Sequence, residues 1–479
     1  MNRIPELLKR SSTVTLQKML FYDLQLNRVL SDSALSVLQN PCGKEEILRR
    51  QDLFIHLEDA DCYAKIKEAF VLLHTLEHNR ELLRNAENEL ARFHLQVTVL
   101  SDYIDVCEYL AALTECGQLF SEISAYFASE PQKDLRTRLR GVHNEALKIL
   151  GNFHKGLLSF SGKVWITPVL DAADECDKIA HCAEKLGFAV REKINRNTKP
   201  DPTLADAILR LHAESAAQLR ALFNDCASVD FAEPLSYLPG IRFFLEIFEL
   251  EQKAAGSGAK HCFPSLSEKP EYLAKEVYDI SLLAKSCVQI VPNDISFSRN
   301  EPFFFLTGAN GGGKTTYLRA VGINLIFFLS GCPVYAKEAR IYPFSFVASH
   351  FPTDERFENT GRLDEELLRV NSLLSDAEGQ TAFLMLNETF SGADESQGFM
   401  LLQDTAERIR NSGHFGLYVT HFHEVKLLDY PLLSAVVDRD NDNKRTYRII
   451  KFKGTVSSYA ADILRKYGLD DESLSKRRS

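Results

Sequence analysis

The stretch Gly308-Ala-Asn-Gly-Gly-Gly-Lys-Thr315 decides the fold of the C-terminal half of this 479-residue chain. Its spacing satisfies the phosphate-loop pattern G-x-x-x-x-G-K-[ST], in which a glycine-rich loop joins a strand to a helix. The apolar run Pro302–Thr307 precedes the loop and predicts a strand, and the helix-compatible run Thr316–Ser330 follows it. Strand, loop and helix in this order predict a nucleotide-binding site.

Each residue type in this loop has a physical reason. The N-terminus of the following helix adds a partial positive charge. Lys314 supplies a point charge for the terminal phosphates, and the Thr315 hydroxyl is the expected Mg²⁺ ligand. Glycines let backbone N–H groups converge on phosphate oxygens without Cβ clashes, and they stand here at Gly308, Gly311, Gly312 and Gly313.

A second apolar strand, Ala382–Leu386, ends in Asn387 and Glu388. This is the Walker B arrangement, in which a metal-side oxygen stands next to a carboxylate that orients or deprotonates the attacking water. Asn387 occupies the metal-side position in place of an aspartate, and its amide brings no negative charge. We therefore expect weaker Mg²⁺ binding and slower turnover, with Glu388 as the general base.

A third strand, Phe415–Thr420, is expected to deliver His421 to the same edge of the sheet. A histidine there can donate a hydrogen bond to the terminal phosphate and link hydrolysis to conformation. His423, two residues further on, is better explained as structural. Short apolar strands that alternate with helical stretches indicate a largely parallel sheet.

The first half of the chain is predicted to be helical. No proline falls between Pro41 and Pro131, and no glycine falls between Gly43 and Gly117. Inside this window apolar residues recur at alternating steps of three and four, which predicts one apolar stripe on a long helix. The stripe consists of Leu83, Ala86, Leu90, Phe93, Val97, Leu100, Ile104, Cys107 and Ala111. It favours a buried helix face over the alternative, a lever that transmits motion.

Charge is unevenly distributed along the chain. The 56 Lys and Arg stand against 66 Asp and Glu, a formal net charge of −10. Residues 133–199 hold 13 basic and 8 acidic residues, so this segment is at +5 and the remainder at −15. Lys and Arg supply the salt-dependent part of nucleic-acid affinity, so Arg136, Arg138 and Arg140 are candidate DNA contacts. A solvated helix face is the competing interpretation.

The composition is that of an ordinary globular protein. Hydrophobic residues make up 45% and charged residues 25%, which excludes disordered, collagen-like and histone-like chains. The longest apolar run is far short of the roughly 20 residues of a membrane span. The N-terminus carries charges where a signal peptide is apolar, and the ten cysteines include no Cys-x-x-Cys pair. We expect a cytoplasmic protein with reduced thiols.

The length predicts about three domains. Residues 1–253 are expected to form a helical core and lever domain, of which about 130–200 is the basic, clamp-like part. The small, Gly- and Ser-containing stretch 254–260 is expected to be a linker. Residues 261–479 are expected to form the phosphate-loop domain. The predicted fold class is therefore α/β plus all-α.

The order of several short motifs resembles the MutS family of DNA mismatch-repair ATPases. The similar stretch is roughly 288–468, with a weaker match through the helical half. In chain order the motifs are Val291-Pro-Asn-Asp-Ile295, Thr307–Thr316, Gly331–Ala336, Asn387-Glu388, Thr420-His421 and Ser457–Ala461. This ordered set is specific to the family, whereas the phosphate loop alone is not.

The resemblance implies an ABC-type P-loop ATPase domain preceded by a long helical lever and clamp domain. It also implies a dimer with each ATP held between two subunits. Asn293 would lie near the adenine, Thr315 and Asn387 on the Mg²⁺ side, and Glu388 and His421 on the γ-phosphate side. The residues implied to wrap the phosphates are Gly308, Asn310, Gly311, Gly312, Gly313, Lys314, Thr315 and Thr316.

Two features depart from the family's pattern. The family has a serine after the catalytic glutamate that reaches the partner's ATP, whereas Asp394 stands at that position here. Either Ser391 or Ser396 takes over, or the dimer sandwich is looser. The family's mismatch sensors also carry an N-terminal domain with a Phe-x-Glu wedge that enters the duplex. This chain begins in helical-core-like sequence, so we expect no wedge recognition.

Two functions from different classes follow. The leading one is an ATPase in DNA repair or recombination, a homodimer whose ATP state sets a clamp on double-stranded or branched DNA. The alternative is a nucleotide-switched dimeric scaffold for a protein partner, with little or no hydrolysis; Asn387, Asp394 and the overall acidity motivate it. A chromosome-maintenance ATPase is disfavoured because such chains need a far longer coiled coil.

Overall fold

The computed structural model describes residues 5–8, 14–153, 158–160, 164–166, 205, 209–210, 212–284, 290–352, 362–438 and 444–452. The chain divides into two compact units. Unit 1 comprises Met1–Leu7 and His56–Arg242, and unit 2 comprises Leu8–Ile55 and Phe243–Ser479. This division differs from the expected boundary at 254–260. The N-terminal segment up to Ile55 belongs with the phosphate-loop unit, and α11 (Leu238–Gly256) continues as helix into the expected linker.

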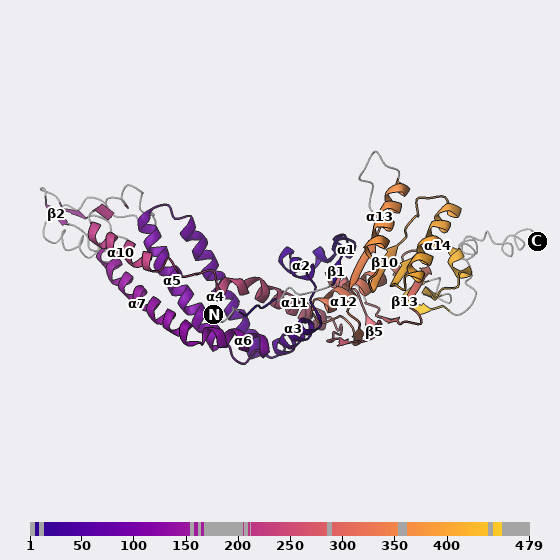
Figure 1. Cartoon of the computed structure of the whole chain (residues 1–479), viewed down its shortest axis with the longest axis horizontal. Helices are drawn as coiled ribbons and strands as arrows, with labels where there is room; N and C mark the ends of the chain where they lie inside the picture. The colour runs from indigo at the N-terminus through magenta and orange to yellow at the C-terminus, as the bar shows by residue number, and fades with distance from the viewer. Residues whose placement is uncertain are drawn as a thin grey trace, which may run out of the picture. The chain divides into compact units, whose positions relative to one another are not determined.

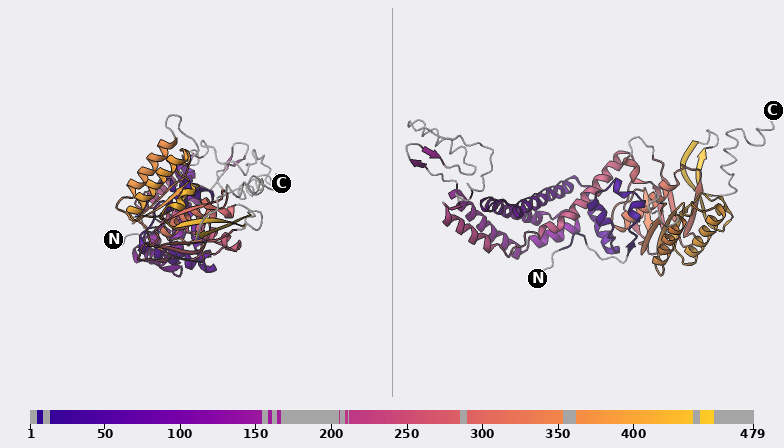
Figure 2. Two further views of the ribbon diagram at one scale, coloured as in Figure 1. Left: turned by 90° about the vertical axis from the view of Figure 1, so that its right-hand side faces the viewer. Right: turned by 90° about the horizontal axis from the view of Figure 1, so that it is seen from above.

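Unit 1 is built from helices that pack side by side. Its elements are α4 (Ala60–Arg84), α5 (Glu89–Ala112), α6 (Gly117–Phe127), α7 (Glu130–Phe153), α10 (Ala213–Asp225), η2 (Pro234–Tyr237) and the two short strands β2 (Leu158–Phe160) and β3 (Val164–Ile166). Helix α5 packs against α4, α6 and α7, and α10 packs against α7 (Figures 1 and 2). The predicted helical character of the first half is thus confirmed.

The apolar stripe belongs to two helices rather than to the single long helix that the sequence predicts. Helix α4 ends at Arg84 with Asn85 as its C-cap, and the Asn88 side chain caps α5 by accepting a hydrogen bond from the Ala91 N–H over 2.8 Å. Asparagine offers the backbone an alternative to continued helix, so the chain turns between the two asparagines. The stripe residues from Leu90 onward lie on α5 and are buried up to Cys107.

Unit 2 contains a seven-stranded sheet. In spatial order its strands are β1 (Thr15–Leu16), β9 (Phe346–His350), β10 (Ala382–Asn387), β11 (Phe415–Val419), β7 (Phe303–Gly308), β12 (Leu432–Asp438) and β13 (Lys444–Lys451). All neighbours are parallel except β12 and β13, which form an antiparallel hairpin. The predicted, largely parallel sheet is confirmed, and the carboxyl ends of β7 and β10 bring their following loops to one edge.

Helices cover both faces of this sheet. Leu384 and Leu386 of β10 pack in one core with Leu373 of α13 (Arg362–Asp376) and Leu402 of α14 (Glu395–Asn411). The intervening residue, Met385, faces α12 (Lys314–Leu329) instead. Successive side chains of β10 therefore point to opposite faces of the sheet. All three helices flank the sheet in Figure 1.

The N-terminal segment of unit 2 completes one side of the sheet. It comprises β1, α1 (Leu20–Asp23), η1 (Leu26–Arg28), α2 (Asp32–Leu38) and α3 (Lys44–Leu57). Thr15 pairs with Phe346 of β9, and the Ser349 hydroxyl donates a hydrogen bond to the Asp23 carboxylate over 2.7 Å. Arg50 of α3 is buried and donates to the Ser330 carbonyl over 3.0 Å at the end of α12.

A second sheet packs near the start of α12. Its strands are β4 (Ser265–Leu266), β8 (Glu338–Ile341), β5 (Tyr272–Val277) and β6 (Asn293–Phe297). The short helix η3 (Ile280–Ala284) lies between β5 and β6 in the chain, and η4 (His423–Leu427) follows β11. Tyr272 and Phe297 join the two sheets because both rings lie edge-on to Phe383 of β10, with centroids 5.9 and 5.1 Å away. Among the described helices, none has the length and apolar character to cross a membrane.

Candidate nucleotide site

A cavity of about 870 Å³ lies at the carboxyl edge of the seven-stranded sheet. The phosphate loop forms its floor, and the strands β6 and β13 and the segment after β5 contribute walls. The residues that line it include Asn293, Asn310, Gly311, Gly313, Lys314, Thr315, Thr316, Glu388, Arg445 and Tyr447. The volume is in the range of pockets that hold small-molecule ligands.

The phosphate loop adopts backbone angles that require glycine. Gly308, Gly311 and Gly313 have φ of 128°, 69° and 92°, a region that side chains with a Cβ rarely enter. A Cβ on Gly308 would also lie 2.9 Å from the Ala435 carbonyl oxygen of β12, and one on Gly312 would lie 2.8 Å from the Ala309 oxygen. Glycine is therefore required in this loop for two reasons: it can adopt positive φ, and it leaves room for neighbouring backbone atoms.

Lys314 begins α12 and points its ammonium back into the loop. Its Nζ donates hydrogen bonds to the Gly308 carbonyl over 2.8 Å and to Asn310 Oδ1 over 3.2 Å. The side chain is buried, which lowers the pKa of the ammonium, and the negative charge of Glu388 opposes that effect. A buried cation held by loop oxygens is suited to receive phosphate oxygens in their place.

Thr315, which lines the cavity, contacts Asn387 at the end of β10. The Thr315 hydroxyl lies 3.4 Å from Asn387 Oδ1, and Asn387 is buried at the end of β10. Two neutral oxygens side by side fit the predicted Mg²⁺ side of the site, although neither supplies a negative charge.

Glu388 sits in a turn with unusual backbone angles. Its φ is 48°, and its N–H donates to the Val419 carbonyl of β11 over 2.8 Å. Phe390, two residues on, has φ of 64° and is fully buried. The Thr389 and Tyr418 hydroxyls are hydrogen-bonded to each other within the core. Such strained conformations cluster at functional sites, where the surrounding packing holds them.

His421 follows β11, as the sequence predicts, but it is exposed and is not among the cavity-lining residues in the part of the chain that the structure describes. Its ring lies against Phe422, with centroids 4.4 Å apart. A role for His421 at the terminal phosphate stays a prediction.

Asn293 makes hydrogen bonds that sequence reasoning did not foresee. Its amide donates to the Tyr447 carbonyl over 3.0 Å, and its Oδ1 accepts from the Ile449 N–H over 2.7 Å. The side chain therefore ties β6 to β13. Sequence reasoning also missed Arg445 and Tyr447 as lining residues, because the hairpin that carries them has no motif of its own.

Asp394 has a local structural role. It is the N-cap of α14, where its carboxylate accepts hydrogen bonds from the Gln397 N–H over 3.0 Å and from the Ser396 hydroxyl over 2.8 Å. These bonds, first of all that from Gln397, hold the pKa of the Asp394 carboxyl below its ordinary value. The Ser396 hydroxyl is thus engaged by Asp394, while Ser391 is exposed.

The candidate DNA contacts on α7 have different environments. Arg136 is buried and donates to the Phe127 carbonyl over 2.6 Å, so it holds unit 1 together and does not present its charge on the surface. Arg138 is exposed. Arg140 is exposed and forms an ion pair with Glu108. Most of the basic segment 133–199 lies outside the described residues.

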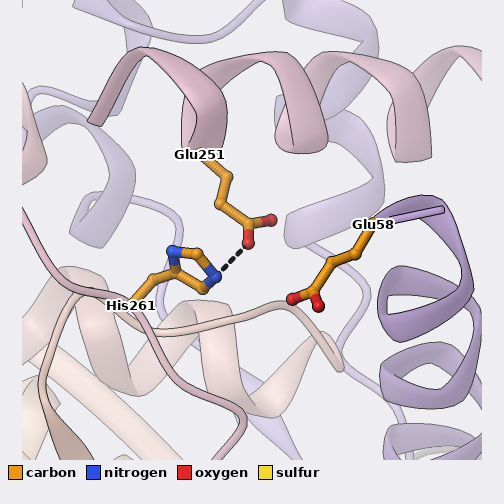
Figure 3. Close-up of side chains that lie close together, drawn as sticks. All are labelled: Glu58, Glu251 and His261. Carbon is orange, nitrogen blue, oxygen red and sulfur yellow. Dashed lines mark ion pairs between the residues drawn. The ribbon is translucent and has the colours of Figure 1, made fainter. Parts of the chain in front are cut away.

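The ion pair of Glu251 and His261 lies in unit 2, away from the cavity. Glu251 of α11 is fully buried, and its carboxylate pairs with His261, whose side chain is 23% exposed (Figure 3). Neither residue lines the cavity described above. The seven cysteines among the described residues are free thiols, and six of them are buried.

Comparison with known proteins places this site in a family. The model of MutS domain V matches residues 304–476. The chain is 30% identical over 149 residues to the DNA mismatch repair protein msh-2 of Neurospora crassa, which covers 30% of this chain and 16% of that protein. It is 22% identical over 392 residues to the DNA mismatch repair protein MSH2 of Saccharomyces cerevisiae, which covers 79% of this chain and 37% of that protein.

A bacterial relative is the endonuclease MutS2 of Solidesulfovibrio magneticus, 27% identical over 191 residues that cover 39% of this chain and 25% of that protein. The chain thus spans less than two-fifths of the length of these relatives. Its C-terminal part is a MutS domain V, which is an ABC-type ATPase domain and implies ATP binding. The chain is thus similar to mismatch-repair and MutS2 proteins, and the predicted resemblance and the fold of the C-terminal domain are confirmed.

Proposed function

We propose that this chain binds ATP with Mg²⁺ in the cavity and hydrolyses it slowly, with Glu388 as the general base. One observation carries the proposal: the buried Lys314 ammonium is held by the oxygens of a glycine loop, at the floor of a cavity that Glu388 also lines. A cation, an array of loop N–H groups and a carboxylate at one edge of a sheet are the parts that phosphoryl transfer needs.

The residues divide this work between binding and chemistry. Lys314 and the loop N–H groups bind the phosphates, and Thr315 with Asn387 would hold Mg²⁺, which supplies positive charge beside the transferred phosphoryl group. Glu388 accepts the proton of the attacking water as general base. Because Asn387 is neutral, we propose that Mg²⁺ affinity is lower than with an aspartate at that position.

The test is a pair of measurements on the full chain. Lys314→Ala should weaken ATP binding at least tenfold in equilibrium titrations, while Lys337→Ala should bind as the wild type does, because that exposed lysine pairs with Glu276 at 3.5 Å and lies away from the loop. Equal ATP affinity in the wild type and Lys314→Ala would refute the proposal.

We further propose that the chain acts as a homodimer whose ATP state sets a clamp on double-stranded or branched DNA. The relatives named as DNA mismatch repair proteins support this, as does the basic character of residues 133–199. Binding should be nucleotide-dependent and should fall steeply with salt. A panel of homoduplex, mismatched, branched and single-stranded DNA, titrated with and without ATP at fixed salt, tests this with Lys314→Ala as the control.

A nucleotide-switched scaffold for a protein partner is the second candidate. The neutral oxygen pair of Thr315 and Asn387 favours it, because a weakly bound metal gives slow hydrolysis. Asn387→Asp distinguishes the two candidates. If the wild type turns over faster than Glu388→Ala, the ATPase proposal stands; if both show no turnover and Asn387→Asp gains it, the switch proposal is favoured.

A further inference from the structure

Arg445 lies against the phosphate loop although it is far away in sequence. A Cβ atom on Gly311 would come within 2.8 Å of both Cζ and Nη1 of Arg445, so the guanidinium packs directly on the glycine. Arg445 also lines the cavity and is exposed, so its charge faces the space above the loop. A side chain at position 311 would displace the guanidinium from this place.

The strand that carries Arg445 is fastened beside the loop from two sides. Asn293 of β6 bonds the backbone of β13 at Tyr447 and Ile449, on either side of Arg448. On the other strand of the hairpin, Ala435 touches Gly308 so closely that a Cβ there would lie 2.9 Å from the Ala435 oxygen. The bulge between Ala435 and Val437 shifts the hairpin register just before Val437 pairs with Arg445. These contacts fix the backbone position from which the Arg445 side chain extends.

The charge of Arg445 has no acidic counterpart among the residues that the structure describes. Two other basic side chains near the site are paired with acidic residues: Lys275 with Asp294 at 2.8 Å, and Lys451 with Glu301. Arg445 forms no such ion pair with the residues that the structure describes. A guanidinium beside a phosphate-binding loop is suited to bidentate contact with an anion, because its planar N–H fork matches two phosphate oxygens.

We propose that Arg445 is a second phosphate-binding cation, supplied by the same chain that supplies the phosphate loop, and that Asn293 is its positioning residue. The proposal rests on the proposed nucleotide binding and deepens it. Lys314 reaches the phosphates from inside the loop, and Arg445 reaches them from above Gly311. The neutral Asn387 is expected to bind Mg²⁺ weakly. Arg445 on the hairpin would supply part of the positive charge that a tightly bound Mg²⁺ would otherwise provide.

The experiment measures equilibrium binding of ATP, ADP and adenosine to the full chain. Arg445→Ala should weaken ATP and ADP binding about tenfold and leave adenosine competition unchanged, since one charge-assisted contact is lost. Arg445→Lys keeps the charge and should recover part of the affinity. Arg448→Ala is the matched control, because Arg448 is an exposed arginine of the same strand outside the cavity.

Asn293 provides a second, independent readout. Asn293→Asp removes the donor to the Tyr447 carbonyl and should also weaken ATP binding. If Asn293 acts through Arg445, the effects of Asn293→Asp and Arg445→Ala are not additive in the double variant. Additive effects would overturn the positioning role.

The outcomes separate this inference from the proposed function. If the wild type binds ATP in a Lys314-dependent way and Arg445→Ala binds it equally well, the role of Arg445 is refuted and the nucleotide site stands. Tighter ATP binding by Arg445→Ala would also overturn it, because the guanidinium would then be occupying the phosphate position. A wild type that binds no ATP refutes both. Matching thermal unfolding midpoints for all variants establish that the comparison is between folded proteins.

Discussion

The buried Glu366 carboxylate of α13 accepts a hydrogen bond from the backbone N–H of Phe390 over 2.8 Å. Phe390 stands two residues after Glu388, and both have positive φ. A non-glycine residue in that region costs about 1–3 kcal/mol, so the turn persists only because its surroundings hold it. Glu366 is one of the groups that hold it, although it lines no part of the cavity.

Removing this contact should impair turnover more than binding. We expect Glu366→Ala to lower kcat about tenfold with little change in ATP affinity, because the turn relaxes and Glu388 loses its alignment. Glu366→Gln keeps an acceptor oxygen and should recover much of the loss. Steady-state kinetics with direct ATP titration measure both quantities. Asp364→Asn, on the exposed side of the same helix, is the control, and wild-type kcat in Glu366→Ala would contradict the prediction.

Glu388 itself should separate binding from chemistry. Glu388→Gln is expected to lower kcat by about a hundredfold, the usual contribution of a general base, while ATP still binds. Single-turnover measurements with preformed complex exclude product release as the cause. Glu424→Gln serves as a comparison at a glutamate outside the cavity. Unchanged single-turnover rates in Glu388→Gln would remove Glu388 from the chemistry.

Asp23 should make unit 2 sensitive to pH. Burial raises the pKa of its carboxyl from the ordinary 3.8 to about 6, against the lowering effect of the Ser349 hydrogen bond. The folded state therefore holds the proton more tightly than the unfolded chain does, and stability falls as the pH rises from about 4 to 6. The difference between the pKa values of the folded and unfolded states corresponds to a loss of roughly 3 kcal/mol in the free energy of unfolding.

Asp23→Asn should flatten this part of the profile, since the amide does not ionise. Urea unfolding between pH 4 and pH 7 measures the free energy of unfolding of both proteins. Asp376→Asn, at an exposed position, should keep the wild-type slope. A slope in Asp23→Asn equal to that of the wild type would mean that another group carries the pH dependence.

The arginines of α7 should divide into two kinds. Arg138→Ala should weaken DNA binding and reduce its salt dependence by about one phosphate contact, because Arg138 is exposed. Arg136→Ala should instead destabilise unit 1 by about 1–3 kcal/mol, because it removes the buried donor to the Phe127 carbonyl. Fluorescence anisotropy at several salt concentrations and thermal unfolding distinguish the effects. If Arg138→Ala binds DNA as the wild type does, the segment is a solvated helix face.

Gly416 should be intolerant of any side chain. A Cβ there would lie 2.2 Å from the Leu384 carbonyl oxygen of the neighbouring strand, and neither backbone can move without breaking the β10–β11 ladder. We expect Gly416→Ala to lower the free energy of unfolding by at least about 2 kcal/mol. Gly256→Ala, in open space at the end of α11, should change it by less than about 1 kcal/mol in either direction. Denaturant unfolding of both variants provides the comparison.

The parts of the site that sequence could predict are those fixed by local spacing. Gly308 to Thr315, and Asn387 with Glu388, stand at strand ends where parallel pairing must bring them together. Arg445 could not be predicted, because its position depends on a bulge in the hairpin and on the Asn293 side chain. The spacing of the apolar stripe also could not predict the break between α4 and α5 at Asn85 and Asn88. A short turn leaves the steps of three and four residues between apolar positions unchanged.

The contact between Asp23 and Ser349 has a consequence for how the chain is made. These residues are 326 positions apart, and the larger part of unit 1, His56–Arg242, lies in the sequence between them. At typical rates of synthesis, on the order of half a minute passes before β9 emerges to pair with β1. Meanwhile the apolar Leu20, Phe21 and Leu24, all buried in the finished fold, lack their native partners. The insertion of residues 56–242 therefore delays the pairing of β1 with β9, so we expect unit 2 to complete its fold after His56–Arg242 has been synthesised.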